Sequence, residues 1–448
     1  MSKARTAAYR ALKAIAEQAA DLPTALERSR ESLTDERDRG LVMDIVTGTL
    51  RWQRALDHLI AHFAQRPLAK VDADVLLLLR MGLYQLMHLD RVPAAAVVDE
   101  AVELTRLARK SSAAPFVNAL LRNVVRQRHR LPLPARPEDA GDRVAALAWL
   151  GVTHSHPEWL VSRWLDRYGF DAAETWVRFN NDPPPLTLRA NRLRTTREGL
   201  QAALAGDDVE TAPTPFAPDG LIVTAGNPLR GGQDGSFVVQ DEASQLVALA
   251  VGARPGEVVL DLCAAPGGKT TALAGEMQGT GFIVACDVRE RRMRLLKRTL
   301  TLTGAARARP VQVDSHGALP FGARFDRVLV DAPCSGLGTV RRDPDIRWMR
   351  TEDELAVLAE RQLVLLARAA DVVKPGGRLV YATCSSEPEE NDGVVAAFLR
   401  EHPEFEPVDL RRELEAPVDG LAGDDGFLRT SPVQRLEAFF AAALIRRA

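Results

Sequence analysis

Apolar side chains recur at helical spacing along the first 130 residues of the chain. Two such series are Ala8, Leu12, Ile15 and Ala19, and then Leu41, Ile45, Trp52, Leu56, Leu59 and Phe63. A repeat of three to four residues is typical of an amphipathic helix. Prolines at positions 93 and 115 interrupt the pattern, and no strand-like alternation intervenes. These features predict an all-α domain over residues 1–135.

The pattern changes near His154. The segment SHPEWLVSRWLDRYG is typical of an amphipathic helix, and PPLTLRANRLRT, which follows it, is typical of a short strand rich in arginine. Prolines and glycines then punctuate short apolar runs between Thr211 and Gly235. We expect a small α+β domain over residues 150–235.

From Phe237 onward, apolar runs of strand length alternate with helical segments. The runs are VVLDL (258–262), GFIVACD (281–287), PVQV (310–313), DRVLVD (326–331) and GRLVYATC (377–384). This alternation predicts an α/β domain over residues 236–448, with a parallel sheet and helices on both of its faces. Because ligands of such sheets bind beyond the carboxyl ends of the strands, the residues that close each strand are candidate site residues.

Composition and charge narrow the class of protein. Hydrophobic residues make up 46% of the chain and charged residues 26%, which excludes collagen-like and broadly disordered chains. The formal net charge of −2 conceals an asymmetry, since residues 1–130 carry +6 and the remainder −8. Residues 106–130 contain seven Lys and Arg and no acid. This segment is either a solvated helix face or a patch that binds an RNA backbone.

The four cysteines are scattered and form no C-x-x-C pair, so we expect no zinc site and a reducing compartment. The basic N-terminus has no unbroken apolar core before Glu17, which argues against a signal peptide. The leucine-rich run at residues 75–79 is far shorter than the roughly 20 residues that span a bilayer. We therefore expect a soluble, cytoplasmic protein without a membrane partner.

The segment VVLDLCAAPGGKT joins a strand to a helix through a tight turn. Gly267 and Gly268 allow the backbone to approach a ligand closely, and the free N–H groups of the next helix favour an anion. A P-loop would need glycine at the position of Cys263, so the segment is not a P-loop.

Acids close the first three strands. Asp287 follows Asp261 by 26 residues, which suits a ribose diol, and Asp314 could meet an adenine edge. No G-x-G-x-x-G accompanies them. A ligand with adenine, ribose, a carboxylate and a cationic sulfonium fits this set, which indicates S-adenosylmethionine.

The fourth strand ends in DAPCSG and the fifth in YATCSS, so Asp331, Cys334 and Cys384 are expected in one cleft. Carbon 5 of cytosine is a poor nucleophile, and a thiolate that adds to carbon 6 activates it. Because a methyl transfer to adenine needs no thiol, the two cysteines favour cytosine as the target.

The chain resembles the RsmB-type (Fmu/Sun) bacterial 16S ribosomal RNA cytosine-5 methyltransferases. Its front half is similar to their NusB-like helical domain in LRMGLYQLMHLDRVPAAAVVDEAVEL and FVNALLR. FVVQDEASQ, DLCAAPGGKT, DAPCSGLGTVRRDPDIRW and YATCSSEPEEND match the catalytic motifs in order. The resemblance implies a Rossmann-like methyltransferase domain that uses S-adenosylmethionine to form 5-methylcytosine in small-subunit ribosomal RNA through a covalent cysteine–cytosine adduct.

The resemblance also implies the roles of individual residues. Cofactor contacts fall on Cys263, Ala264, Ala265, Pro266, Gly267, Gly268, Lys269, Asp287, Asp314 and Asp331. Cys384 attacks the base, Cys334 assists product release, and Asp331 also steadies the protonated cytosine ring. No metal is expected. Further basic contacts to RNA are expected at Arg189, Arg192, Arg194, Arg341 and Arg342.

Some features depart from the family pattern. Where the family usually reads Asp-Gly-Phe-Phe near its C-terminus, this chain has EAFF at residues 437–440, and small changes surround Leu337 and Asp343. Two alternatives stay open at this point. One is a transfer-RNA cytosine methyltransferase, and the other is a non-enzymatic RNA-binding factor.

Overall fold

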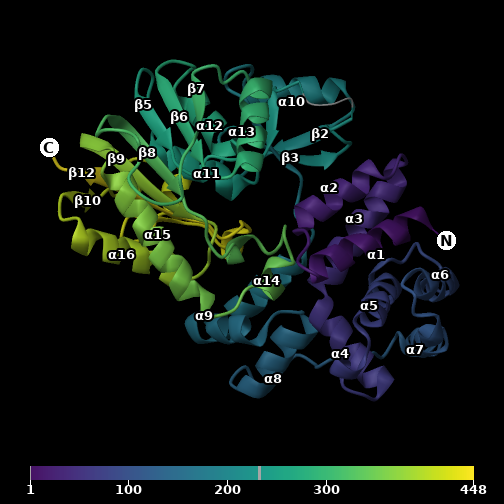
Figure 1. Cartoon of the computed structure of the whole chain (residues 1–448). Helices are drawn as coiled ribbons and strands as arrows, with labels where there is room; N and C mark the ends of the chain where they lie inside the picture. The colour runs from purple at the N-terminus through teal and green to yellow at the C-terminus, as the bar shows by residue number, and fades with distance from the viewer. Residues whose placement is uncertain (1, 231–233) are drawn as a thin grey trace. The chain divides into compact units, whose positions relative to one another are not determined.

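A computed structural model describes residues 2–230 and 234–448, and Figure 1 shows its elements. The chain divides into two compact units. Unit 1 contains Met1–Pro183 and Val340–Arg350, and unit 2 contains Pro184–Thr339 and Thr351–Ala448. The predicted domain bounds at residues 135, 150 and 235 stay predictions.

The front of unit 1 is all-α, as the apolar spacing predicts. Its helices are α1 (Lys3–Ala16), α2 (Leu22–Glu31), α3 (Glu36–Arg51), α4 (Gln53–Ala64), α5 (Ala73–His88), α6 (Ala94–Leu107) and α7 (Ala114–Gln127). Asp21, Asp35 and Asp72 each accept a hydrogen bond from a backbone N–H of the helix that follows, which stabilises the first turn. The apolar faces of α1, α3 and α5 share one core, in which Leu12, Ile45 and Leu78 are buried.

The rest of unit 1 consists of α8 (Arg143–Ala148), α9 (Glu158–Asn181) and the short α14 (Ile346–Met349). Arg347, on α14, is fully buried. Its guanidinium donates to the carbonyl oxygens of Ser155 and Asn180 and to the Asn181 side chain, at 3.0–3.2 Å. These bonds attach the segment Val340–Arg350 to helices more than 150 residues away in the sequence.

Unit 2 begins with a small antiparallel sheet in the order β2-β3-β1-β4. Its elements are β1 (Thr187–Ala190), α10 (Arg197–Gly206), β2 (Glu210–Pro213), β3 (Gly220–Ala225) and β4 (Phe237–Val239). The expectation that Arg189 contacts RNA is wrong, because this side chain is only 4% exposed. It points inward from β1 and donates to Thr271 Oγ1 at 2.6 Å.

The large sheet has the order β10-β12-β9-β8-β5-β6-β7. Its strands are β5 (Val258–Asp261), β6 (Phe282–Asp287), β7 (Ala308–Gln312), β8 (Phe325–Asp331), β9 (Val373–Thr383), β10 (Phe405–Pro407), β12 (Phe440–Arg446) and, paired with β12, β11 (Leu428–Arg429). The five predicted strands are confirmed as β5 to β9, which pair in parallel.

Two antiparallel strands that were not predicted extend the parallel sheet at one end. β12 runs antiparallel to β9, with Phe440 opposite Thr383, and β10 runs antiparallel to β12. The apolar run FAAAL of β12 is buried, so it satisfies its backbone groups between two strands rather than at an edge. The chain order does not reveal that this last strand lies inside the sheet.

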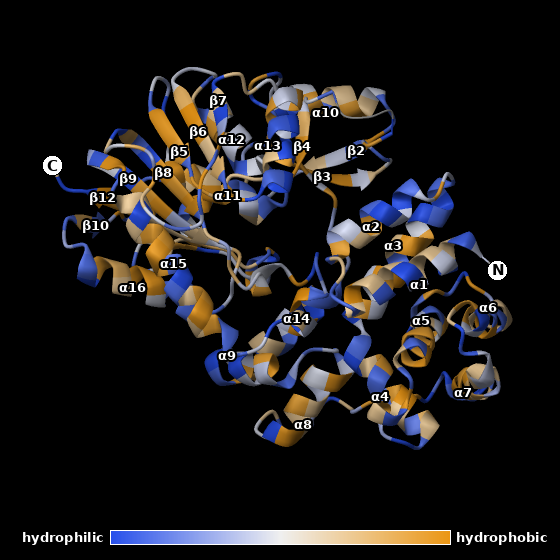
Figure 2. Ribbon diagram, in the orientation of Figure 1, coloured by the Kyte–Doolittle hydropathy of each residue, from blue (hydrophilic) through white to orange (hydrophobic). Residues whose placement is uncertain are grey.

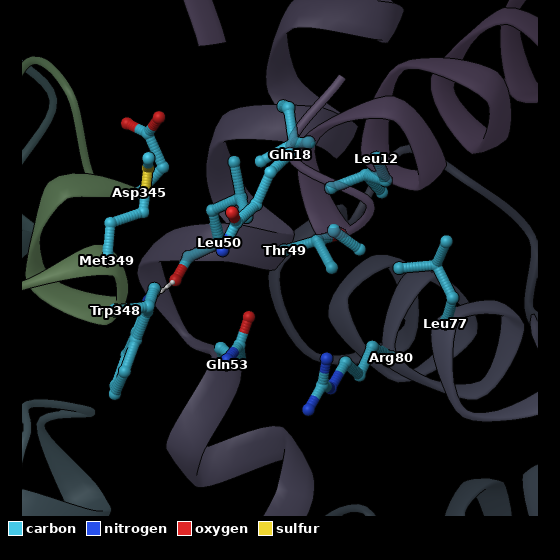
Figure 3. A pocket seen from close by; sticks show the side chains of 12 residues that line it. Leu12, Gln18, Thr49, Leu50, Gln53, Leu77, Arg80, Asp345, Trp348 and Met349 are labelled. Carbon is cyan, nitrogen blue, oxygen red and sulfur yellow. Dashed lines mark hydrogen bonds between the residues drawn. The ribbon is translucent and has the colours of Figure 1, made fainter. Parts of the chain in front are cut away.

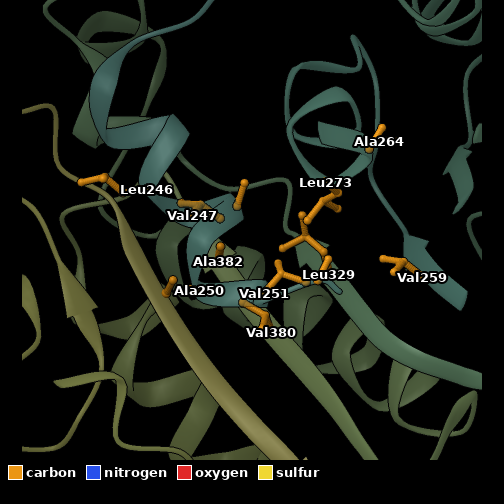
Figure 4. Packing of buried hydrophobic residues seen from close by; sticks show 14 of the residues in the cluster. Leu246, Val247, Ala250, Val251, Val259, Ala264, Leu273, Leu329, Val380 and Ala382 are labelled. Atoms are coloured by element: carbon orange, nitrogen blue, oxygen red, sulfur yellow. The ribbon is translucent and has the colours of Figure 1, made fainter. Parts of the chain in front are cut away.

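Helices cover both faces of the large sheet, as predicted. One face packs against α11 (Glu242–Val251), α12 (Gly268–Glu276) and α13 (Glu290–Thr303), and Figure 4 shows Val247 and Val251 of α11 near Val380 of β9. The other face packs against α15 (Glu354–Ala370) and α16 (Asp392–Glu401). Burial on both faces explains the continuous apolar strands in Figure 2. No helix in the described ranges is long and apolar enough to cross a membrane.

Candidate active site

The turn between β5 and α12 approaches its surroundings closely. Gly267 has φ +109°, a conformation that favours glycine, and a Cβ built there would lie 3.1 Å from Leu296 Cδ1 on α13. The residues from Cys263 to Lys269 therefore form a tight backbone loop at the carboxyl edge of the sheet. Burial and the nearby Asp331 raise the pKa of the half-buried Cys263 thiol, so this cysteine stays protonated.

Asp261 ends β5 beneath this loop and is fully buried. Its Oδ2 accepts a hydrogen bond from Thr270 Oγ1 at 2.7 Å, whereas its Oδ1 has no hydrogen-bond partner among the described residues. Burial raises the pKa of this carboxyl to about 7. The unsatisfied oxygen is available to a donor group of a ligand.

Asp287 ends β6 and is 4% exposed. One carboxylate oxygen accepts from the Ala265 backbone N–H at 3.3 Å and pairs with Arg292 Nε at 3.2 Å, and the other accepts from the Val288 N–H at 2.8 Å. The carboxylate is thus connected to the loop between β5 and α12. Asp287 therefore lies beside the glycine turn.

Asp314 differs from its predicted position at the end of a strand. β7 ends at Gln312, two residues earlier, and the Asp314 side chain is 82% exposed. Its carboxylate accepts from the His316 N–H at 3.1 Å within its own turn. The Val313 N–H donates to the Asp287 carbonyl at 3.2 Å, so Asp314 still lies at the same edge of the sheet.

An ion pair at this edge of the sheet connects α12, which follows β5, to the end of β8: it forms between Lys269 and Asp331. Lys269 Nζ lies 2.7 Å from Asp331 Oδ2. Burial alone would lower the pKa of Lys269, but the Asp331 carboxylate outweighs it and raises this pKa, with a further contribution from Cys384. A fixed ammonium therefore interacts electrostatically with both Asp331 and Cys384.

The thiols of Cys334 and Cys384, which were expected in one cleft, are in contact. Cys334 Sγ, on the loop after β8, lies 3.3 Å from Cys384 Sγ, directly after β9. This distance is too long for a disulfide and suits a hydrogen bond between thiols. The contact with Cys384 and burial raise the pKa of Cys334 well above the usual thiol range. Cys334 therefore keeps its proton and can donate it toward Cys384.

A buried carboxylate that the sequence analysis missed connects the two cysteine loops. Glu390 is fully buried and accepts from the Ser335 N–H at 2.8 Å, from Gln362 Nε2 at 2.9 Å and from Ser385 Oγ at 2.5 Å. Ser335 and Ser385 directly follow Cys334 and Cys384, and their hydroxyls lie 3.1 Å apart. The signal in the sequence was an acid within the matched motif YATCSSEPEEND, but motif matching alone assigned it no role.

Two buried acceptor atoms without partners among the residues that the structure describes lie at the site, where S-adenosylmethionine would bind. Gln240, in the motif FVVQDEASQ, is buried, and within residues 2–230 and 234–448 its Oε1 has no partner. Its side-chain amide lies beside Gly268, at 3.6 Å from a Cβ built there. Together with Asp261 Oδ1, this oxygen suits a cationic ligand at the glycine turn. The residues present therefore fit the methyl donor.

Two other features lie apart from these residues. In unit 1, a cavity of about 310 Å³ is lined by residues that include Leu12, Thr49, Leu77 and Trp348, and Figure 3 shows Trp348 Nε1 donating to the Leu50 carbonyl. No predicted site residue lines this cavity. In the part of the chain that the structure describes, no group of three or more His, Cys, Asp and Glu is arranged to hold a metal ion.

Comparison with known proteins gives matches along the whole chain. Residues 248–445 match the family described as 16S rRNA methyltransferase RsmB/F, residues 2–126 match the NusB family, and residues 156–230 match the ferredoxin-like domain of RsmF/B-like methyltransferases. These matches confirm the predicted combination of an all-α NusB-like domain, a small α+β domain and a methyltransferase domain.

Individual relatives agree with the family matches. The probable ribosomal RNA small subunit methyltransferase B of Bacillus subtilis is 39% identical over 85% of this chain and 84% of its own length. The ribosomal RNA small subunit methyltransferase B of Pseudomonas putida is 36% identical over 91% and 92%, respectively. The crystal structure of PH0851 covers 99% of this chain and 98% of its own, with a TM-score of 0.81 and 28% identity. The chain therefore belongs to the RsmB/F family of 16S ribosomal RNA methyltransferases, and its cofactor is S-adenosylmethionine.

Proposed function

We propose that the protein forms 5-methylcytosine in 16S ribosomal RNA through a covalent adduct between Cys384 and the target base. The observation that carries this proposal is the pair of thiols, Cys334 and Cys384, 3.3 Å apart at the ends of adjacent parallel strands. They lie beside the ion pair of Lys269 and Asp331. A methyltransferase whose target is already nucleophilic needs no such pair.

The first step activates the base. The Cys384 thiolate forms a bond to carbon 6, and the electron pair of the double bond between carbons 5 and 6 moves into a new double bond between carbons 4 and 5. The pair of the double bond between carbon 4 and N3 moves onto N3, which takes up a proton from the solvent. The Asp331 carboxylate, held by Lys269 at 2.7 Å, is suited to accept a hydrogen bond from that protonated ring. Carbon 5 thereby becomes nucleophilic.

The surroundings of the thiols support Cys384 as the nucleophile. The pKa of Cys334 is raised well above its usual range by the contact with Cys384 and by burial, so Cys334 serves as a proton donor. A thiolate at Cys384 would have this thiol proton and the Lys269 ammonium as neighbours. A hydrogen-bond donor and a cation both stabilise a thiolate.

The loop from Cys263 to Lys269, with Gln240, Asp261, Asp287 and Asp331, would hold S-adenosylmethionine. The bound cofactor would supply an electrophilic methyl group for carbon 5 and leave as the neutral thioether. Asp314 lies at the same edge, where it would contact the adenine. After methylation, a base removes the proton from carbon 5, the double bond between carbons 5 and 6 forms again, and the bond to Cys384 sulfur breaks. Cys334, in contact with that sulfur, can protonate the departing thiolate.

The front of unit 1 supports ribosomal RNA as the substrate. The basic segment of residues 106–130 exposes arginines on and around α7, namely Arg106, Arg109, Arg122, Arg126, Arg128 and Arg130. Exposed cations without intervening acids suit an RNA backbone. The relatives' names specify the small ribosomal subunit, and these relatives match 85% and 91% of this chain.

The experiment incubates the protein with unmethylated 16S RNA, or separately with transfer RNA, and a labelled methyl donor. Label at cytosine carbon 5 of 16S RNA is expected. Label only in transfer RNA would favour the transfer-RNA alternative, and a failure to bind the methyl donor in calorimetry would favour a non-enzymatic factor.

Two variants then test the roles of the thiols. Cys384→Ser is expected to abolish turnover, and Cys334→Ser to retain a covalent RNA adduct that migrates slowly in a denaturing gel. An adduct that requires Cys334 and survives the loss of Cys384 would reverse the two roles.

A further inference from the structure

Helix α13 and its flanking residues form a strongly basic segment in a part of the chain that is otherwise acidic. Residues 288–309 contain eight Lys and Arg and one acid, Glu290. The chain from residue 131 to its end carries −8, so this segment opposes the charge of its surroundings.

The charges gather on the solvent-facing side of α13. Met293, Leu296 and Leu300 are buried against the sheet. Arg291, Arg294, Leu295 and Arg298 are exposed, and their spacing of three, four and seven residues places them on one face. Lys297 extends this face, and Figure 2 shows α13 as strongly hydrophilic.

The basic face continues beyond both ends of the helix. Exposed Arg289 precedes α13, and exposed Arg307 and Arg309 follow it. At the carboxyl end, Arg194 donates to the Leu302 carbonyl at 2.9 Å, so an arginine from the small sheet joins the same face. We call this set of exposed cations, on α13 and next to its two ends, the α13 strip: Arg194, Arg289, Arg291, Arg294, Lys297, Arg298, Arg307 and Arg309.

Two ion pairs involve arginines of α13. Arg292 pairs with Asp287, and Arg294 pairs with Glu290 at 2.8 Å between two largely exposed side chains. An exposed pair of this kind contributes little to stability. Lys297 and Arg298 have no acidic partner among the described residues.

The strip begins at the edge of the active site. Asp287 ends β6 three residues before α13, and Arg292 Nη2 donates to the Ala265 carbonyl of the loop between β5 and α12 at 2.6 Å. From there, α13 runs along β6 and β7 toward the opposite edge of the sheet. A polyanion that reaches the site can therefore continue along this helix.

We propose that the α13 strip binds the phosphate backbone of the substrate RNA, as a second contact surface within unit 2 that is separate from residues 106–130. This inference rests on the proposed function, since it assumes an RNA substrate. RNA suits the strip because phosphates recur at regular intervals along a strand, as the cations do along the helix. An acidic protein partner is the other occupant that the experiment distinguishes.

The test compares two double variants with equal change in charge. Lys297→Gln/Arg298→Gln removes two cations from the strip, and Arg361→Gln/Arg400→Gln removes two exposed cations from α15 and α16 on the opposite face of the sheet. Both pairs are exposed, so the fold should tolerate them, and thermal unfolding and methyl-donor calorimetry check this.

The readout is the Kd for a 16S RNA fragment across a series of salt concentrations. The strip variant should bind at least about fivefold more weakly near 0.1 M salt, with a salt slope lower by about 1.4 if each cation contacts one phosphate of a single strand. The control variant should match the wild type.

Two outcomes would overturn the inference. The strip variant could bind RNA as the wild type does, which is the result that an acidic protein partner would give, or the control could lose as much affinity. Each leaves the proposed function intact if the wild type still methylates 16S RNA. If the wild type did not methylate 16S RNA, the proposed function itself would be contradicted.

Discussion

Replacement of Glu390 by glutamine tests how the two cysteine loops are held together. The carboxylate accepts three hydrogen bonds, from the Ser335 N–H, from Gln362 Nε2 and from Ser385 Oγ. A glutamine side chain has a single acceptor oxygen, so at least one buried donor would face an amide N–H₂ group instead.

The expected loss of folding stability follows from these three hydrogen bonds. Hydrogen bonds to a charged group contribute about 1.5–3 kcal/mol each and neutral ones about 0.5–1.5 kcal/mol, so Glu390→Gln should cost about 3 kcal/mol over three bonds. For a unit of 150–250 residues, that corresponds to a fall in Tm of roughly 6–12 °C. A shift of about 1 Å between the cysteine loops could lower kcat by about a hundredfold.

The assay separates positioning from general damage. Differential scanning calorimetry gives the Tm, methyl transfer to 16S RNA gives kcat, and titration calorimetry gives the Kd for the methyl donor. We expect kcat and Tm to fall while this Kd stays within about twofold. The control is Glu401→Gln, which makes the same chemical change at an exposed glutamate at the end of α16. A Glu390→Gln variant with the kcat and Tm of the wild type would refute the reasoning.

Three further substitutions test other parts of the structure. Gly267→Ala, at φ +109°, would place a Cβ 3.1 Å from Leu296 and should cost about 1–2 kcal/mol and weaken methyl-donor binding in calorimetry, whereas unchanged affinity would contradict a tight turn. Asp261 has a pKa raised to about 7, so between pH 4 and 7 the folded state keeps a proton that the unfolded chain has lost. The wild type should therefore lose stability relative to Asp261→Asn as the pH rises through this range, by at most about 1.4 kcal/mol per pH unit, and Tm values that differ equally at pH 5 and pH 8 would argue against it. Arg347→Met should leave buried acceptors, including the carbonyls of Ser155 and Asn180, without a donor and destabilise unit 1 by about 3 kcal/mol or more; an unchanged urea midpoint would contradict this.

Local patterns in the sequence were enough to predict most elements of the fold and to indicate the candidate site residues. The spacing of apolar residues predicted the helices of the front half and the strands β5 to β9, because burial on one face or on both imposes a local periodicity. Short motifs at the strand ends predicted the glycine turn, the acid at the end of β6 and the two cysteines after β8 and β9. Each motif consists of residues close together in the sequence, and parallel strands bring their carboxyl ends to a common edge.

The way in which distant segments combine could not be predicted from the sequence and follows from tertiary packing. In the structure, β12 lies antiparallel beside β9, and the segment Val340–Arg350 belongs to unit 1. Arg189 is buried and Asp314 is exposed. Glu390 lies against both cysteine loops and accepts a hydrogen bond from Ser335, which is 55 residues away in the sequence. Such pairings depend on register and packing between distant parts of the chain, which leave no periodic signal in the sequence.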